Sequence, residues 1–283
     1  MPPIRVFLLT VIALIAFAGN SLLCRLALKN TDIDPASFTT IRLLSGALIL
    51  FLIVGMQRKK VAGAGNWLSA FALFIYAAGF SFAYLQLSAA TGALLLFAAV
   101  QATMLGYGFW SGERLQIIQI IGLVMALSGL LILLLPGVSA PSLSNSLLMI
   151  SAGIAWGIYS LRGKTASDAT LATAGNFLRA SVFAIMLSVI MLESKSLDTA
   201  GIGYAICSGA LTSGIGYAIW YAALPSLKAA TAATVQLSVP VITAMGAIVL
   251  LDEAISLRIV LASVTILGGI ALVILQKNTK ASL

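Results

Sequence analysis

The chain has 283 residues, of which 61% are hydrophobic and only 8% are charged, and its formal net charge is +8. A soluble domain carries about 25% charged residues to hydrate its surface, so this composition excludes an ordinary soluble fold and predicts an all-α integral membrane protein. The basic residues are scattered between apolar runs, where such charges set membrane orientation, and we expect no nucleic-acid partner.

A helix needs about 20 apolar residues to cross the hydrocarbon core of a bilayer. Breaks at charges and at clusters of Pro, Gly and Ser divide the chain into ten predicted transmembrane spans. They are residues 5–28, 36–57, 66–86, 90–112, 115–135, 144–161, 169–192, 200–222, 229–251 and 257–276.

Two of these assignments depend on weak signals. The first span also resembles a secretory signal peptide, because Arg5 precedes an apolar run that contains Ala16-Phe17-Ala18, a pattern similar to a cleavage site. The apolar character continues as far as Leu28, which favours a span. Residues 61–112 hold no charge, so only the sequence from Ser88 to Gly92 predicts a tight hairpin between the third and fourth spans.

Lys and Arg residues predict the orientation of these spans. Ten lie at ends on the same side as the N-terminus: Arg5, Arg58, Lys59, Lys60, Arg114, Arg162, Lys164, Lys228, Lys277 and Lys280. Four lie at the other side: Arg25, Lys29, Lys195 and Arg258. Because cytoplasmic loops carry the excess of positive charge, we expect a multi-pass protein of the bacterial inner membrane with both termini in the cytoplasm.

The two halves of the chain share an order of residues. An offset of 140 residues aligns residues 87–93 with residues 227–233, and a slightly shorter offset aligns Arg42 with Arg179. Each half holds five predicted spans, an odd number, so the halves are expected to lie in opposite orientations. Such inverted-topology repeats are typical of secondary transporters. The sequence predicts residues 1–138 and 139–283 as the two five-helix repeats of one transport unit.

Short motifs accompany the repeat. They are Tyr217-Ala218-Ile219-Trp220-Tyr221-Ala222-Ala223-Leu224, Ala229-Ala230-Thr231-Ala232-Ala233, Pro240, Glu253, Ala155-Trp156 and Ser160. With the ten-span pattern, they resemble the drug/metabolite transporter superfamily, specifically members with two EamA-type repeats. Within it the chain is most similar to bacterial amino-acid exporters, including aromatic amino-acid exporters. The resemblance implies a central cavity lined by spans one to four and six to nine, with spans five and ten at the periphery.

Ionisable groups inside a membrane are costly and tend to be functional. The sequence has no histidine, and its acidic residues fall at span ends or in connections: Asp32, Asp34, Glu113, Asp168, Glu193, Asp198, Asp252 and Glu253. This predicts transport without proton coupling. Arg42 and Arg179 are embedded charges that either capture a substrate carboxylate or brace the helices, and their matched positions favour the structural role.

Polar and aromatic residues near the predicted midplane are the candidate substrate-binding residues: Asn20, Tyr76, Phe80, Tyr84, Phe97, Gln101, Trp156, Tyr159, Tyr217 and Gln236. Further residues of these kinds are Phe17, Thr212, Ser213, Trp220, Tyr221 and Ser238. The alternative roles are helix packing, interhelical hydrogen bonds and interfacial aromatic belts. Pro240 is the only proline deep inside a predicted span, where it removes a backbone hydrogen bond near Gln236. It is a predicted hinge or gate, with a static kink as the alternative.

These features predict a secondary transporter that exports small amphipathic metabolites by alternating access through a central cavity. Amino acids, aromatic ones among them, are the favoured substrate class. A multidrug or other metabolite exporter of the same superfamily is the first alternative, and a channel or scaffold is the second. No Walker-type loop, dinucleotide-binding motif or nucleophile beside a base is present, so we expect neither an enzyme nor a cofactor or metal. The expected partners are the small-molecule substrate and the lipid bilayer, and the oligomeric state stays open.

Overall fold

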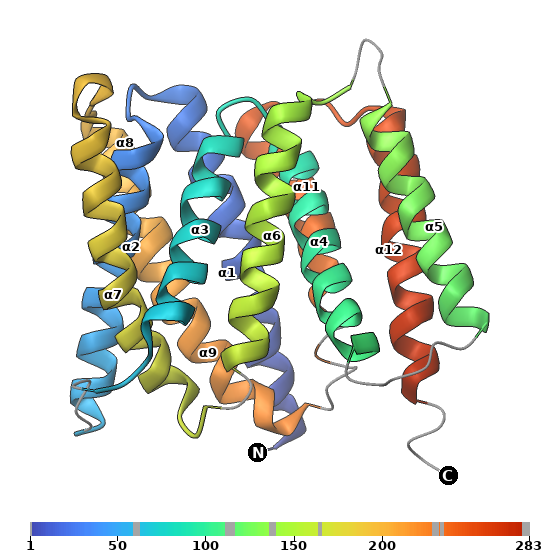
Figure 1. Ribbon diagram of the computed structural model, residues 1–283, viewed down its shortest axis with the longest axis horizontal. Helices are drawn as coiled ribbons and strands as arrows, with labels where there is room; N and C mark the ends of the chain where they lie inside the picture. Colours follow the sequence, from blue (N-terminus) through green and yellow to red (C-terminus); the bar gives the residue numbers. More distant parts are fainter. Residues whose placement is uncertain are drawn as a thin grey trace.

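The computed structural model describes residues 2–58, 63–110, 117–135, 140–163, 166–227, 232 and 235–278. Helices stand side by side in one bundle (Figure 1). The first half holds α1 (Pro3–Asn30), α2 (Pro35–Met56), α3 (Trp67–Ala83), α4 (Ala89–Trp110) and α5 (Ile117–Leu134). The second half holds α6 (Leu143–Gly163), α7 (Ala169–Ile190), α8 (Thr199–Cys207), the π-helix η2 (Ser208–Ile215), α9 (Gly216–Ala223), α11 (Ser238–Leu251) and α12 (Leu257–Asn278). Single helical turns lie at η1 (Leu192–Ser194) and η3 (Leu224–Ser226).

Polar side chains mark where several helices begin. Asp34, Asn66, Asp168 and Asp198 each accept a hydrogen bond from a backbone N–H in the first turn of α2, α3, α7 and α8, at 2.9, 2.8, 3.0 and 2.8 Å. These caps satisfy donors that have no partner within the helix. The cap role explains why the three aspartates among them lie at the ends of helices.

The outer surface of the bundle is apolar. Six helices within the described residues are long and apolar enough to cross a membrane, and three shorter apolar helices span Trp67–Ala83, Ser238–Leu251 and Leu257–Val273. Large apolar side chains such as Leu48 and Val249 are exposed, as expected for a surface that faces lipid. α6 begins with polar residues at 144–146 and packs between α3 and α4 (Figure 1). The chain is an all-α, multi-pass membrane protein.

The two halves of the chain have inverted topology. When α8, η2 and α9 are taken as one crossing, the described helices cross the bundle ten times, and α12 ends at the face where α1 begins (Figure 1). We call this the termini face and the other the opposite face. α6 is the first helix of the second half, and it begins at the opposite face. The predicted pair of inverted five-helix repeats is therefore confirmed.

α5 and α12 form a pair at one edge of the bundle (Figure 1). They cross closely, because a Cβ atom added to Gly269 would lie 2.4 Å from the carbonyl oxygen of Gly122. Glycine allows the two backbones to approach where a larger residue would not. The pair lies at the periphery, as the family resemblance implied.

The eighth and ninth predicted spans contain irregularities. The eighth is continuous but passes through the π-helix η2. In the ninth, predicted as residues 229–251, Leu237 lies in a turn and α11 begins only at Ser238. Residues 229–231, 233 and 234 lie outside the described part of the chain. Residues 235 and 236 are helical and Pro240 is the third residue of α11, so the turn at Leu237 interrupts the span three residues before Pro240. Proline cannot donate a backbone hydrogen bond to the carbonyl of Gln236. This interruption agrees with the expected local effect of Pro240, and its role as a hinge or gate stays a prediction.

Candidate functional site

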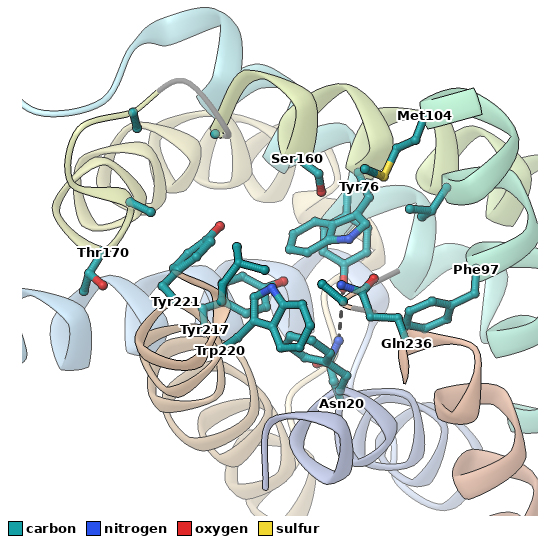
Figure 2. A pocket seen from close by; sticks show the side chains of 18 of the residues that line it. Asn20, Tyr76, Phe97, Met104, Ser160, Thr170, Tyr217, Trp220, Tyr221 and Gln236 are labelled. Carbon is teal, nitrogen blue, oxygen red and sulfur yellow. Dashed lines mark hydrogen bonds between the residues drawn. The ribbon is translucent and has the colours of Figure 1, made fainter. Parts of the chain in front are cut away.

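A central cavity of about 660 Å³ lies between helices of both repeats (Figure 2). Side chains from α1, α3, α4, α6, α9 and the segment before α11 line it. None of the described lining residues belongs to α2, α5 or α12, although the family resemblance implied that the second span lines the cavity. The volume of the cavity lies within the range of small-molecule sites, about 300–1,000 Å³.

Helical spacing brings the lining side chains onto common faces. On α9, Tyr217, Trp220 and Tyr221 follow the spacing i, i+3, i+4, which places them on one side of the helix. On α1, Phe17 and Asn20 follow the same spacing. On these helices the residues of one face line the cavity, whereas in an ordinary bundle the residues of such a face pack against a neighbouring helix.

Aromatic rings form one wall of the cavity, which we call the aromatic wall: Phe17, Trp156, Tyr217 and Trp220. The ring centroid of Trp156 lies 5.0 Å from that of Tyr217, and Phe17 lies 5.7 Å from Tyr217 and 5.8 Å from Trp220. Pairs at these distances stabilise one another beyond the area they bury. The wall presents fixed ring faces and edges to an apolar or aromatic solute.

A polar network occupies the end of the cavity farthest from the termini face, which we call the deep end. The Asn20 side chain donates to the Tyr76 hydroxyl at 3.2 Å (Figure 2) and accepts from Ser208 at 2.7 Å and Thr212 at 3.4 Å. Arg42 donates to the same Tyr76 hydroxyl at 2.9 Å. Buried polar groups are stable when they are paired in this way. The deep end can therefore offer oriented hydrogen-bonding groups to a solute.

The cavity opens at the termini face. Ser167 and Pro225 line it there and are exposed to solvent, and we call this end the mouth. At the deep end the lining residues Asn20, Ser21 and Tyr76 are all buried. The structure thus gives access to the cavity from one face of the bundle.

Beyond the deep end, charged side chains close the bundle toward the opposite face. Arg25 forms a salt bridge with Glu253 at 3.0 Å and donates to the carbonyl of Tyr84 at 2.8 Å. The second carboxylate oxygen of Glu253 accepts from the backbone N–H of Ala89 at 2.7 Å, and Lys29 donates to the Leu251 carbonyl at 2.7 Å. We call this set the closure cluster. It joins α1 to the α3–α4 hairpin of its own repeat and to the end of α11 in the other repeat.

Most of the predicted binding residues line the cavity: Asn20, Tyr76, Phe80, Phe97, Gln101, Trp156, Tyr217 and Gln236. Tyr84 and Tyr159 are not among the lining residues. Tyr84 is fully buried with its hydroxyl donating to the Ala89 carbonyl at 3.3 Å. Tyr159 stacks behind Trp156 at 5.4 Å and donates to Thr173 at 3.2 Å.

The two embedded arginines have different surroundings. Arg42 is 1% exposed and lies over the rings of Tyr76 and Phe80, 5.1 and 4.9 Å from their centroids. Arg179 is only partly buried and donates to the carbonyls of Ala64 and Gly175. Arg179 therefore contacts backbone carbonyls, whereas Arg42 contacts the polar network of the deep end, and the choice between bracing and substrate capture stays a prediction for both.

Some lining residues escaped the sequence analysis. Met104, Ser167 and Thr170 lie along α4 and at the mouth (Figure 2 labels Met104 and Thr170). Met104 and Thr170 do not stand out within their predicted spans, and Ser167 lies in a connection between two spans, so no sequence pattern marks them. Pro240 is buried outside the lining set, although Gln236 before it lines the cavity. Within the described residues, no group of three or more His, Cys, Asp or Glu side chains could hold a metal ion.

Comparisons with known proteins give a family match, similar sequences and a similar structure. The sequence profile of the EamA-like transporter family matches residues 4–135 and again residues 143–275. The chain is 52% identical over 283 residues to the uncharacterized protein PA1977 of Pseudomonas aeruginosa, covering 100% of this chain and 99% of that protein. It is 24% identical over 254 residues to the uncharacterized transporter YoaV of Bacillus subtilis, covering 84% of this chain and 87% of YoaV. One solved crystal structure shares the fold with a TM-score of 0.67 at 17% identity, covering 95% of this chain and 98% of the other.

Proposed function

Since the chain belongs to the EamA-like transporter family, we propose that it exports small amphipathic metabolites, with amino acids that carry apolar or aromatic side chains as the favoured class. The observation that carries this proposal is the central cavity, which combines an aromatic wall with a polar deep end. An amphipathic solute needs both surfaces, because its apolar part leaves water while its polar part keeps hydrogen-bonding partners.

The structure has the form expected of one state in an alternating-access cycle. The mouth is open at the termini face, and the closure cluster joins the two repeats on the other side of the cavity. Inverted repeats can exchange such arrangements, because each half can adopt the conformation of the other. A channel requires a path open at both faces, so the one-sided cavity favours a carrier.

The distribution of basic residues supports a cytoplasmic location for both termini in a bacterial inner membrane. In that orientation the mouth faces the cytoplasm, and the structure is the inward-open state. An exporter loads its substrate in this state, which is why we propose export as the physiological direction.

The cavity supports transport without proton coupling. Proton-coupled carriers use carboxylates or imidazoles that titrate within the membrane. The sequence has no histidine. Of the described acidic residues, Asp168 caps α7 at the mouth and Glu253 is held in the closure cluster, and neither lies at the midplane.

Uptake into proteoliposomes tests the proposal. We expect saturable uptake of labelled phenylalanine, tyrosine and leucine that does not change when a proton gradient is imposed. Trp156→Ala removes one ring of the aromatic wall and should slow this uptake, whereas Trp110→Ala alters a ring that is 90% exposed and outside the lining of the cavity and should not. Gradient-driven uptake would contradict the absence of coupling. Failure to transport any amino acid would contradict the substrate class.

A further inference from the structure

The positive charge of Arg42 is unbalanced at the deep end of the cavity. Its side chain is 1% exposed, and no carboxylate of the described residues lies within salt-bridge distance of it. The Nη1 atom has no hydrogen-bond partner. An ionised group removed from water without a counter-charge is costly. Among the described residues, Arg42 therefore keeps one donor without an acceptor and a charge that no carboxylate neutralises.

Tyr76 stands between this charge and the cavity. Its hydroxyl accepts from Arg42 Nη2 at 2.9 Å and from Asn20 Nδ2 at 3.2 Å. A phenol has two acceptor positions and one hydrogen to donate. Because both acceptor positions are filled, the hydroxyl has only its hydrogen left to offer, and Tyr76 lines the cavity.

The orientation of Asn20 fixes this arrangement. Its side-chain oxygen accepts from Ser208 and Thr212, so the amide nitrogen is the end that faces Tyr76. If the Asn20 amide were rotated by 180°, its oxygen would face the Tyr76 hydroxyl and would accept the hydroxyl hydrogen, which could then not be donated to a solute. Donation from the cationic Arg42 also polarises the phenol, because hydrogen bonds in a chain strengthen one another.

The charges along the cavity differ between its two ends. The carboxylate of Asp168 lies at the mouth, whereas Arg42 lies behind the deep end. The charge of Arg42 behind the deep end favours a zwitterion that enters from the termini face with its carboxylate directed inward. The aromatic wall lies between the two ends and contacts the apolar part of such a solute.

We propose that Tyr76 donates its hydroxyl hydrogen to the carboxylate of the transported solute and so selects carboxylates over amines. Arg42 is a positioning residue that acts through Tyr76, and Asn20 holds Tyr76 in the donating orientation. This inference rests on the function proposed above, and it narrows the substrate class to solutes that present a carboxylate beside an apolar side chain.

Binding of three related compounds tests the inference. L-Phenylalanine carries both charged groups, 3-phenylpropionate lacks the amino group and phenethylamine lacks the carboxylate. We expect calorimetric titration of the purified full chain to show the two carboxylates binding at least about tenfold more tightly than the amine, the size of a hydrogen bond to a charged group. Tyr76→Phe removes one hydroxyl and should reduce this ratio to below about threefold, without weakening the amine. Tyr107→Phe makes the same chemical change at a ring 58% exposed on the outer surface and should keep the wild-type ratio.

Equal affinity of the wild type for phenylalanine and phenethylamine overturns the inference, and this comparison needs no variant. Equal weakening of all three compounds by Tyr76→Phe also overturns it. The same compounds measured in the liposome assay separate the two proposals. Transport without discrimination contradicts carboxylate recognition alone, whereas carboxylate-selective binding without transport supports recognition and contradicts the transport function.

Discussion

The two repeats contain the same order of five crossings in opposite orientations, but they differ in the regularity of their helices. In the first repeat, α3 runs without interruption over Trp67–Ala83 and α4 over Ala89–Trp110. Their counterparts in the second repeat are irregular, because the eighth span contains the π-helix Ser208–Ile215 and α11 begins only after the turn at Leu237. Both irregularities lie next to the cavity. π-Helical segments and interrupted helices are often found at functional sites.

The difference shows how a symmetric scaffold builds an asymmetric site. The π-helix directs Ser208 and Thr212 toward Asn20 of the first repeat. Arg42 of the first repeat lies behind the same network, while Arg179 of the second repeat braces the connection at Ala64. Sequence symmetry therefore preserves the crossings of the helices, and local changes in each half specify the binding groups.

The largest effect is expected from replacing the two arginines that occupy matched positions in the repeats. Arg42→Gln removes the charge behind Tyr76 and should lower phenylalanine uptake by about 100-fold, since hydrogen bonds to charged groups contribute up to about 3 kcal/mol. Arg179→Gln loses contacts to backbone carbonyls away from the cavity and should lower uptake by less than about threefold. Uptake is compared at equal amounts of reconstituted protein. Equal losses in both variants would show that the arginines act alike.

A second prediction concerns the contact between the repeats at the closure cluster. Glu253→Gln removes the salt bridge to Arg25, whose side chain is 13% exposed, and should shift the equilibrium toward the opposite-face-open state by about 30-fold, or about 2 kcal/mol. In a background without native cysteines, Ser21→Cys lies in the cavity below Arg25. Its labelling by an impermeant maleimide from the opposite face reports the shift.

Glu193→Gln is the matched control for this prediction, because Glu193 is exposed at the same face and belongs to no closure contact given above. Labelling should stay at the level of the parent protein. An identical labelling rate for the Glu253 and Glu193 variants would show that the salt bridge does not hold the bundle closed.

The sequence predicted the transmembrane spans and most of the residues that line the cavity. It did not predict contacts between residues that are far apart in the chain. Long apolar runs and clear breaks predict the spans, and rings such as Trp156 and Tyr217 stand out at mid-span. The Arg25–Glu253 pair joins residues 228 positions apart, and no local pattern links them. The π-helix has no distinct hydrophobic period, so the sequence of this span predicts only an ordinary α-helix. The alignment of Arg42 with Arg179 favoured a structural role for both, because a repeat pattern does not show which neighbours surround each side chain.

The π-helix should depend on close packing against α2 of the first repeat. A Cβ atom on Gly209 would lie 2.0 Å from the Ser45 hydroxyl oxygen and 2.1 Å from the Arg42 carbonyl oxygen, whereas one on Gly203 would meet no heavy atom within 4 Å. Gly209→Ala should therefore destabilise the protein by about 1.5 kcal/mol and lower its unfolding temperature by about 4 °C. Gly203→Ala in the adjoining α8 should leave the temperature within about 1 °C. Thermal unfolding in detergent compares the two, and equal temperatures would mean that the π-helix is not tightly packed.

The smallest effect is expected at the other irregularity, the interruption before α11. In a continuous helix the ring of Pro240 would clash with the carbonyl of Gln236, four residues earlier. Pro240→Ala removes this clash and allows the helix to extend back through Leu237, which would reorient Gln236 in the cavity. We expect phenylalanine uptake to fall about fivefold, a barrier change near 1 kcal/mol, with an unfolding temperature within about 2 °C of wild type. Pro141→Ala, just before α6 at the opposite face, should change neither quantity. Amide exchange at residues 236–239, which have an N–H in both proteins, measures the cause directly, because a continuous helix would slow exchange there. Reduced uptake with unchanged exchange would show that Pro240 acts by some means other than interrupting the helix.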